Sequence, residues 1–306
     1  MDRANIEEIL HLPLEEALAI AGRARREGVG DSLETCGIMS AKSGVCGEDC
    51  KFCAQSSRYR TSIDEYSLKS ASEIVEAAHC AKEEGSKRFG IVTSGRRLTD
   101  REVEVIIDAV RRIKEEVDIL PCASLGALKK ESFMRLKEAG LMRYHHNIET
   151  SERFYPRVVS THDYGERVET IREAKLSGLE VCSGGIFGLG ESWQDRVDMA
   201  LLLKELQVDS VPLNFLVPIK GTPLENRKPL TSHEALRIIA LFRVVLPAKT
   251  IRIAAGRECV FEGCQDMMYE AGANGMMVGG YLTITGGGVR EDLALVERIR
   301  DLWRRE

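Results

Sequence analysis

The sequence predicts an α/β fold, a (β/α)8 TIM-type barrel with an N-terminal helical extension. Short apolar runs alternate with longer amphipathic segments along the whole chain, which is the pattern of parallel strands connected by helices. Eight strand candidates can be counted, and a length of 306 residues suits one large barrel domain. No low-complexity linker divides the sequence. We therefore expect residues 1–30 to add an N-terminal helix to a barrel over residues 31–306.

The predicted strands and helices alternate in regular order. The strands are expected over residues 33–40, 88–93, 118–124, 142–148, 179–184, 209–215, 250–254 and 274–278. Apolar residues recur at helical spacing between these runs, so helices are expected over residues 71–84, 101–116, 164–176, 193–206 and 233–245. In such a barrel, the residues that perform chemistry lie on the loops at the C-terminal ends of the strands.

Charge and cysteine usage narrow the class of protein. The net charge is -5, and acidic and basic residues are interspersed, so no basic stripe for nucleic acid is present. No apolar run approaches the roughly 18 residues that a membrane span needs. The N-terminus lacks a basic region followed by an apolar core, so a cytoplasmic location is expected. In a reducing compartment, nine cysteines favour metal or redox chemistry over disulfides.

Cys46, Cys50 and Cys53 form the most informative group of residues, with the spacing C-x3-C-x2-C. A full ligand set for a 4Fe-4S cluster is four, so three thiolates leave one iron open for an exchangeable ligand, which we expect to be S-adenosylmethionine. Zinc also binds thiolates, but the sequence lacks a partner pair at C-x2-C spacing, so an iron–sulfur cluster is favoured. The triplet follows the first predicted strand, where a barrel places its chemistry.

The residues around the triplet resemble a known signature. Residues 41–59, with the run Cys53-Ala-Gln-Ser-Ser, resemble the signature of the biotin synthase family within the radical S-adenosylmethionine superfamily. The resemblance extends from about residue 33 to the C-terminus. Blocks that resemble further family blocks in the same order begin at His146, Val181, Val211, Gly221, Ile251 and Ala271.

The resemblance implies a radical enzyme that converts dethiobiotin to biotin. The reduced 4Fe-4S cluster would cleave S-adenosylmethionine to methionine and a 5′-deoxyadenosyl radical, which abstracts hydrogen at C9 and then at C6. An auxiliary iron–sulfur cluster would supply the sulfur that closes the thiophane ring. The protein must then position these groups and keep out solvent and oxygen. Flavodoxin or ferredoxin as reductant and a homodimer are further expectations from the family.

The resemblance also assigns residues to S-adenosylmethionine. These cofactor-binding candidates are Phe52, Ser94, Gly95, Asn147, Glu149 and Arg167. Phe52 is expected near the adenine, the turn at Ser94 near the amino acid end, and Arg167 on the carboxylate in a bidentate geometry. The respective structural alternatives are a packing aromatic, an ordinary loop and a surface position on a helix.

The remaining catalytic candidates are polar residues of the predicted strands. Asn147 could contact both substrates, and Glu149 could accept two hydrogen bonds from the ribose hydroxyls. His145 stands where the family often has a second asparagine, which leaves one hydrogen bond to the substrate open. Asn214 is an amide in an apolar strand and needs a partner, for which the ureido ring of dethiobiotin would serve. Arg252 completes the catalytic set.

Cys122, Cys182 and Arg252 are the candidates for the auxiliary cluster. Both cysteines lie in apolar strands, and an arginine inside a barrel needs an anionic partner such as a thiolate-ligated cluster. A free cysteine is also often a small buried hydrophobe. The family pattern has three cysteines and this arginine around a 2Fe-2S cluster, but Gly90 occupies the place of the third cysteine.

Four other cysteines could replace the missing ligand. Cys36 is the best candidate because its strand leads into the radical motif and must line the same interior. Cys259 and Cys264 are close to Arg252 in sequence but are expected on a loop, and Cys80 is expected to pack within a helix. We hypothesise an atypical branch whose auxiliary cluster differs in ligands or nuclearity, for example a 4Fe cluster that carries an additional sulfide.

Three other functions share part of this pattern. A methylornithine synthase-like or hydrogenase maturase-like radical enzyme would share the triplet and the barrel, but not the combination of Cys53-Ala-Gln-Ser-Ser, Asn214 and the strand with Arg252. A noncatalytic iron–sulfur carrier would produce no 5′-deoxyadenosine. A degenerate enzyme without sulfur insertion would release desaturated or deuterium-exchanged dethiobiotin.

Overall fold

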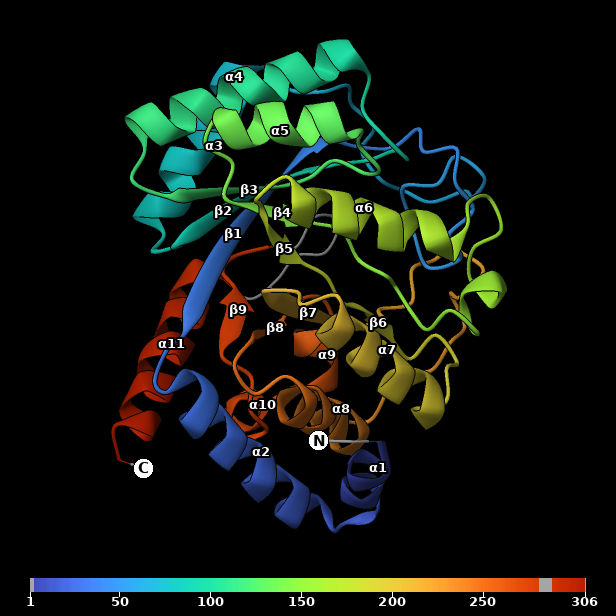
Figure 1. The fold of residues 1–306 in the computed structure, drawn as a ribbon, viewed down its shortest axis with the longest axis vertical. Helices are drawn as coiled ribbons and strands as arrows, with labels where there is room; N and C mark the ends of the chain where they lie inside the picture. The colour runs from blue at the N-terminus through green and yellow to red at the C-terminus, as the bar shows by residue number, and fades with distance from the viewer. Residues whose placement is uncertain (1–2, 281–287, 306) are drawn as a thin grey trace.

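The computed structural model describes residues 3–280 and 288–305, which form a parallel barrel surrounded by helices (Figure 1). The strands are β1 Glu34–Lys42, β2 Arg88–Thr93, β3 Leu120–Ser124, β4 Arg143–His145, β5 Glu180–Cys182, β6 Gly185–Phe187, β7 Ser210–Phe215, β8 Thr250–Ile253 and β9 Gly275–Met277. Their order is β5-β4-β3-β2-β1-β9-β8-β7-β6, and a further pairing of β5 with β7 closes the barrel. β5 and β6 both pair with β7 and are two halves of one barrel strand. The predicted barrel of eight strands is therefore confirmed.

Alternate residues of each strand point into the barrel, because successive side chains of a strand lie on opposite faces of the sheet. In β2, Phe89 and Ile91 belong to the apolar core, whereas Gly90 and Val92 line the interior. The same alternation turns Cys36 of β1 inward, as the sequence predicted. The barrel interior is therefore the place where residues of different strands meet.

The fifth barrel strand is interrupted, whereas the sequence predicts a continuous strand over residues 179–184. Two residues separate β5 from β6. A Cβ atom on Gly184 would lie 2.0 Å from the carbonyl oxygen of Pro212, and one on Gly185 would lie 2.4 Å from the carbonyl oxygen of Glu149. Only glycine permits two backbone segments to approach this closely. The two glycines at the break therefore allow the segment that follows β4 to pack directly against the fifth strand.

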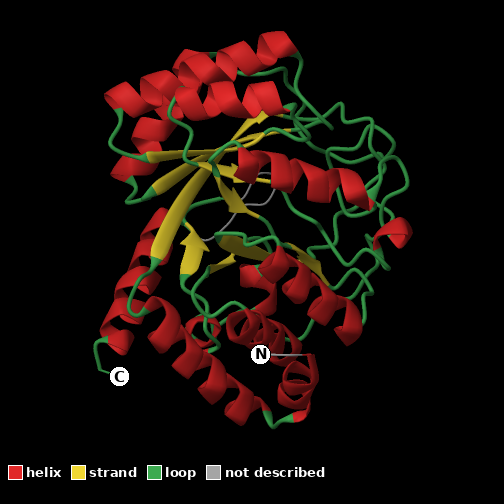
Figure 2. Cartoon of the chain, in the orientation of Figure 1, coloured by secondary structure: helices red, strands yellow, loops and turns green. Residues whose placement is uncertain are grey.

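The helices lie outside the strands (Figure 2) and begin where the sequence supplies caps. Three of them start at capping boxes, in which an N-cap hydroxyl and an acidic side chain three residues later satisfy each other's backbone N–H groups. These pairs are Ser70 with Glu73, Thr99 with Glu102, and Ser192 with Asp195. Among the described residues, no helix is both long and apolar enough to cross a membrane. The helices around the barrel are α3 Ala71–Glu83, α4 Asp100–Glu116, α5 Lys130–Glu138, η1 Tyr155–Arg157, α6 Tyr164–Leu176, α7 Trp193–Glu205, α8 Ser232–Val245, α9 Arg257–Val260, α10 Met267–Glu270 and α11 Val289–Trp303.

Two helices precede the barrel, α1 Arg3–His11 and α2 Leu14–Val29. The predicted N-terminal helical extension is therefore confirmed, but the expectation that it is a single helix is wrong. Pro13 stands at the N-cap of α2. Proline has no N–H to donate and therefore cannot continue the hydrogen-bond ladder of α1. Both helices contact α8 in the lower part of Figure 1. Arg237 of α8 donates to the carbonyl oxygen of Leu12 at 2.8 Å, which fixes the turn between them.

Candidate active site

Two adjoining cavities lie in the barrel and at the C-terminal ends of its strands. The inner cavity, of about 290 Å³, is lined by Cys36, Cys122 and Cys182. The outer cavity, of about 250 Å³, is lined by Cys46 and Cys50. A molecule in one cavity would contact groups that also face the other. Residues that line both cavities include Phe52, Cys53, His145, Asn147 and Glu149.

The radical motif, Cys46, Cys50 and Cys53, lies on the loop that follows β1, and all three residues line the outer cavity. The Cys46 N–H donates to the carbonyl oxygen of Gln55 at 3.1 Å, and the Cys53 N–H donates to that of Cys50 at 2.9 Å. Burial raises the pKa of the Cys50 thiol and raises the pKa of Cys53 to about 11. The thiolates must therefore form as a metal displaces their protons.

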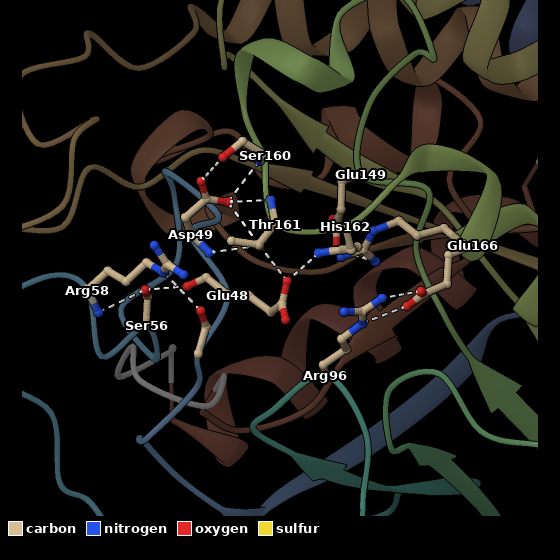
Figure 3. A network of polar contacts seen from close by, with 12 residues as sticks. Glu48, Asp49, Ser56, Arg58, Arg96, Glu149, Ser160, Thr161, His162 and Glu166 are labelled. Carbon is tan, nitrogen blue, oxygen red and sulfur yellow. Dashed lines mark hydrogen bonds and ion pairs between the residues drawn. The ribbon is translucent and has the colours of Figure 1, made fainter.

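The loop is held from outside by a loop clamp, in which Glu48 and Asp49 contact Ser160, Thr161 and His162 (Figure 3). Asp49 accepts from the Ser160 N–H at 2.8 Å and from the Thr161 N–H at 3.2 Å. Glu48 accepts from the Thr161 hydroxyl at 2.5 Å and lies 2.5 Å from His162 Nδ1. Desolvation opposes ionisation of Asp49, but the hydrogen bonds from Ser160 and Thr161 lower its pKa to about 2. The clamp joins the radical motif to the segment that leads into α6.

A chain of contacts continues from the loop clamp to the floor of the outer cavity. His162 Nε2 lies 2.7 Å from the Tyr155 hydroxyl, which accepts from Arg167 Nε at 2.8 Å. Arg167 Nη1 donates to the carbonyl oxygen of Asn147 at 2.9 Å and lies 3.5 Å from Glu149 Oε1. The Arg167 side chain is 12% exposed and lines the outer cavity, so its surface alternative is excluded.

Asn147 and Glu149 lie where the two cavities meet. Asn147 Oδ1 accepts from the Gly184 N–H at 3.1 Å and lies 2.9 Å from His145 Nε2, while Asn147 Nδ2 donates to Glu149 Oε2 at 3.3 Å. Protein groups thus occupy Oδ1 and one N–H of Nδ2 of Asn147, and the second N–H of Nδ2 remains for a ligand. Glu149 has a φ of +66°, a left-handed conformation that costs free energy in a residue other than glycine. Such strain is common where a side chain must face a ligand.

Ser94, Gly95 and Phe52, the remaining candidates for S-adenosylmethionine, also line the outer cavity. Gly95 has a φ of +102°, which favours glycine, and the turn presents its backbone to the cavity. The Ser94 hydroxyl donates to the carbonyl oxygen of Gly44 at 2.8 Å and so attaches this turn to the radical loop. The half-buried Phe52 ring lines both cavities.

Asn214 lines the inner cavity, but its amide already has backbone partners. Asn214 Nδ2 donates to the carbonyl oxygen of Gly185 at 3.1 Å, and Oδ1 accepts from the Ala255 N–H at 3.2 Å. The buried amide therefore does not need the substrate as its first partner.

The inner cavity brings together the cysteines that the sequence assigned to the auxiliary cluster. Cys36, Cys122 and Cys182 are buried on three different strands, and all line the cavity together with Arg252. Gly90 lines it as well and is paired with Cys122 in the sheet. Cys36 lies on β1, the strand next to that of Gly90. Its partner in β2 is residue 88, so it lies two residues closer to the N-terminal end of the sheet than Gly90. The third sulfur is therefore shifted by one strand from the position at Gly90.

Three remaining cysteines lie away from both cavities. Cys80 is exposed on α3, so the expectation that it packs within the helix is wrong, because its face of α3 points to solvent. Cys259 is exposed on the short helix α9, not on a loop as expected. Cys264 is half-buried beyond that helix. Cys36 is therefore the only one of the four alternative cysteines that lines the inner cavity of the described chain.

The residues of the inner cavity fit an anionic iron–sulfur cluster. Arg252 Nε is buried and has no hydrogen-bond partner, so it is a donor without an acceptor. Desolvation opposes ionisation of Cys182, but His145 beside it lowers the pKa of this thiol to about 6. Within the described residues, no three His, Cys, Asp or Glu side chains converge closely enough to enclose one metal ion. A multi-iron cluster spaces its protein ligands more widely, because its own sulfides and irons lie between them.

Sequence reasoning missed several residues of the site. The loop clamp joins side chains more than 100 residues apart, and no local pattern marks such a pair. Arg88 and Arg143 also contribute to the barrel interior, as described below. Both arginines stand in predicted strands, so the argument that identified Arg252, a charge in a buried strand, could have found them.

Comparisons with known proteins distinguish between the radical enzymes that could have this site. The model of the Radical SAM superfamily matches residues 41–203, and that of the Biotin and Thiamin Synthesis associated domain matches residues 212–299. A biotin synthase of Thermotoga petrophila is 48% identical over 300 residues, which cover 98% of this chain and 99% of the relative. The chain belongs to the biotin synthase family.

Further comparisons separate family from fold. A biotin synthase of Thermodesulfovibrio yellowstonii is 50% identical over 277 residues, 90% of this chain and 87% of the relative. The crystal structure of methylornithine synthase superposes with a TM-score of 0.82 at 20% identity, over 98% of this chain and 92% of that one. The structure of a hydrogenase maturase of Carboxydothermus hydrogenoformans superposes with a TM-score of 0.78 at 19% identity, over 97% of this chain and 78% of that one. Such low identities show a shared barrel alone, so the methylornithine synthase-like and maturase-like alternatives are not favoured.

Membership in the biotin synthase family establishes the class of chemistry. The chain is a radical S-adenosylmethionine enzyme and a sulfurtransferase. Its cofactors are a 4Fe-4S cluster, S-adenosylmethionine and an auxiliary iron–sulfur cluster.

Proposed function

We propose that the protein inserts sulfur into dethiobiotin at C9 and C6 to form biotin, with the radical chemistry in the outer cavity and the sulfur donor in the inner cavity. The observation that carries this proposal is the pair of adjoining cavities, with Cys46, Cys50 and Cys53 on the wall of the outer one and Cys36, Cys122 and Cys182 from three strands on the wall of the inner one. When bound, the 4Fe-4S cluster supplies the electron that cleaves S-adenosylmethionine, and the auxiliary cluster supplies sulfur. The substrate would lie between them, beside Asn147 and Glu149.

The outer cavity has the groups that S-adenosylmethionine needs. Arg167 would bind the cofactor's carboxylate, and Glu149 would accept hydrogen bonds from the ribose hydroxyls. The backbone at Ser94 and Gly95 would meet the amino acid end, and Phe52 would contact the adenine. Arg167 is already oriented by its hydrogen bonds to Tyr155 and to the Asn147 carbonyl, so little side-chain entropy is lost on binding.

The inner cavity has the groups that orient dethiobiotin. Asn147 would donate its remaining Nδ2 hydrogen to the substrate, and the amide of Asn214 would contact the ureido ring. Both amides are fixed by other protein groups, which suits a reaction that needs C9 and C6 at a defined distance from the radical and the sulfide. His145, which stands in place of an asparagine, would act on Asn147 rather than on the substrate.

The auxiliary cluster would be held by Cys36, Cys122 and Cys182, with Arg252 beside it. The burial of Cys36 in the inner cavity, together with Gly90, supports a ligand set that differs from the family pattern. We infer an enlarged 4Fe cluster that carries an additional sulfide. Iron quantification of the anaerobic protein tests this inference, because a total of about eight iron per chain is expected for the enlarged form and about six for a 2Fe-2S form.

Further features of the proposal rest on the sequence pattern, and the reductant and the dimer rest on the family. We infer that residues 1–30 are an extension of a barrel over residues 31–306, that flavodoxin or ferredoxin is the reductant, and that the protein is a cytoplasmic homodimer that binds no nucleic acid. Analytical ultracentrifugation of the reconstituted protein tests the dimer. A monomer at micromolar concentration would contradict it.

The experiment that tests the function follows 5′-deoxyadenosine and biotin together by mass spectrometry. Reconstituted protein is incubated without oxygen with dithionite, S-adenosylmethionine and dethiobiotin, and the Cys122→Ala and Cys182→Ala variants serve as controls. We expect both products from the native chain and no biotin from the controls. If 5′-deoxyadenosine appears without biotin, sulfur insertion is wrong, and a desaturated or deuterium-exchanged dethiobiotin would identify the degenerate reaction.

A further inference from the structure

An ionic layer, formed by Glu34, Glu180, Arg88, Arg143 and Arg252, lies beneath the inner cavity near the N-terminal ends of the strands. Glu34 of β1 accepts from Arg88 Nε at 2.6 Å and Arg143 Nη1 at 2.8 Å, and it also contacts Arg252 Nη2. Glu180 of β5 accepts from Arg143 Nε at 2.9 Å and lies 3.1 Å from Arg88 Nη2. Four strands other than β1 thus contribute charge to one layer.

The ionic layer holds more positive than negative charge. Three guanidinium groups face two carboxylates, and the arginine side chains of Arg88, Arg143 and Arg252 are only 9%, 5% and 5% exposed. Glu180 is 37% exposed, so water screens its charge and it offsets less of the excess. A buried excess of positive charge is costly unless an anion lies close by. The layer therefore predicts an anion in the cavity above it.

The three thiols of the inner cavity are the groups that face this excess charge. Cys36 is paired with Arg88 in the sheet, and Cys122 is paired with Arg143. Arg88 Nη1 lies 4.0 Å from Cys122 Sγ. Arg143 and Arg252 both line the cavity, and each interacts electrostatically with all three thiols. A cluster bound to these thiols would lie within the field of both arginines.

Arg143 and Arg252 differ in whether all their guanidinium nitrogens already donate hydrogen bonds. Arg252 has an unpartnered Nε and can donate directly to a cluster. All three guanidinium nitrogens of Arg143 already donate to carboxylates, Nε to Glu180 at 2.9 Å, Nη1 to Glu34 at 2.8 Å and Nη2 to Glu34 at 3.4 Å. Its orientation is therefore fixed without a ligand, and it acts on the cavity chiefly through its charge.

We propose that Arg143, held in place by Glu34 and Glu180, is a positioning residue that stabilises the reduced auxiliary cluster and so favours formation of the carbon–sulfur bond. This inference rests on the proposed function. If a substrate carbon radical bonded to a cluster sulfide, one sulfide electron would pair with the radical, and a second would pass to a ferric iron, which would become ferrous. The total charge would stay the same, because the sulfide would lose the negative charge that the iron gains. The irons would be held by Cys36, Cys122 and Cys182, beside which Arg143 lies, so its fixed guanidinium would stabilise the negative charge that moves onto them.

The charge of Arg143 can be separated from its packing with three variants. Arg143→Gln removes the charge, Arg143→Lys retains it, and Glu34→Gln removes a negative charge while the arginines stay. Arg196→Gln is the matched control, because Arg196 is a buried arginine of α7 paired with Glu191 and Glu234 at 2.8 and 2.7 Å and lines neither cavity. Its loss removes a buried ion pair of similar geometry elsewhere in the fold.

The experiment is a redox titration of each reconstituted holoenzyme, followed by electron paramagnetic resonance, with the radical cluster as internal reference. We expect Arg143→Gln to lower the midpoint potential of the auxiliary cluster by about 59 mV or more, a tenfold shift in its one-electron equilibrium. Arg143→Lys should restore most of the shift, and Glu34→Gln should shift the potential upward. The radical cluster and the Arg196→Gln control should stay unchanged.

The outcomes separate the inference from the function on which it rests. A native chain without a second cluster would overturn both. A second cluster whose potential is the same in Arg143→Gln and in the native chain would overturn the role of Arg143 alone. If Arg143→Gln does not bind its auxiliary cluster, the Glu34→Gln variant tests the inference instead. A loss of packing alone would not raise the midpoint potential of the cluster. A lowered or unchanged potential in Glu34→Gln would therefore contradict the inference.

Discussion

The radical motif and the cysteines of the inner cavity are held by two different kinds of structure. Cys46, Cys50 and Cys53 share one loop, which the loop clamp fixes by hydrogen bonds to residues 160–162 (Figure 3). Cys36, Cys122 and Cys182 lie on three strands, and only the register of the closed barrel brings them together. The arrangement of the three loop cysteines therefore depends on their local spacing in the sequence, whereas the arrangement of the three strand cysteines depends on the whole fold.

This difference agrees with what each cluster must do. In the proposed arrangement, a loop beside the outer cavity would leave one side of a cluster open to an exchangeable cofactor. A layer of strand residues above a set of buried ion pairs would enclose the other cluster and fix the charge around it. Changes in the loop should therefore affect radical formation first, and changes in the strands should affect sulfur insertion alone.

The largest expected effects separate the two groups of cysteines. Cys50→Ala should lower both 5′-deoxyadenosine and biotin formation by at least about 100-fold, since even groups outside the ligand set cost up to that factor. Cys36→Ala should abolish biotin but leave 5′-deoxyadenosine within about threefold of the native rate, because the radical motif is intact. Mass spectrometry of both products gives the comparison, and the exposed Cys80→Ala is the control. Equal losses of both products in Cys36→Ala would remove the distinction.

Asn147 tests the place where the two regions meet. It lines both cavities and orients Glu149, so Asn147→Ala should lower biotin formation by about 100-fold and also raise the KM for S-adenosylmethionine. Steady-state kinetics with each substrate varied in turn would measure both effects. An unchanged KM for the cofactor would place Asn147 with the inner cavity alone.

The loop clamp should matter for one cluster only. Asp49→Asn weakens the hydrogen bonds to Ser160 and Thr161, so the radical cluster should be lost to a chelator about 10-fold faster while the auxiliary cluster is retained. Iron release can be followed by absorbance, with Glu104→Gln as a control that removes an exposed ion pair far from both cavities. Parallel loss of both clusters would argue against a local clamp.

The smallest effect is expected at the rim of the outer cavity. Glu166 is paired with Arg96, whose hydrogen bond lowers the pKa of this carboxyl below its usual 4.5. The pair is partly exposed, so Glu166→Gln should raise the KM for S-adenosylmethionine by only about threefold. Because the pKa of Glu166 is lowered, the contribution of its ion pair with Arg96 is complete above pH 4.5 and is lost as the pH falls through the lowered pKa. The ratio of the KM of Glu166→Gln to that of the native chain should thus be constant between about pH 6 and about pH 8.

The sequence predicted much of the fold because its signals are local. The strands and helices follow from periodicity, and the inward face of Cys36 follows from the alternation of side chains along β1. The radical motif is contiguous, so its spacing alone identifies it. The turn at Pro13 that divides the N-terminal segment was also visible in the sequence, because proline lacks an N–H, but the prediction of one helix overlooked it.

Other parts of the site could not be predicted because they depend on pairs of side chains far apart in the chain. Glu48 and His162 are separated by 114 residues, and Glu34 and Arg252 by 218. A charged residue at the start of a strand, such as Glu34, is usually solvated, and only the closed barrel buries it among arginines. The surface exposure of Cys80 likewise depends on which face of α3 meets the barrel.

The measurement that tests the central claim most directly is the iron content and Mössbauer spectrum of the Cys46→Ala, Cys50→Ala, Cys53→Ala triple variant, reconstituted without oxygen. If the strand cysteines hold a separate enlarged cluster, about four iron per chain should remain. Adding Cys36→Ala should remove them. A triple variant that retains no iron, or one whose iron is unaffected by Cys36→Ala, would contradict an independent cluster in the inner cavity.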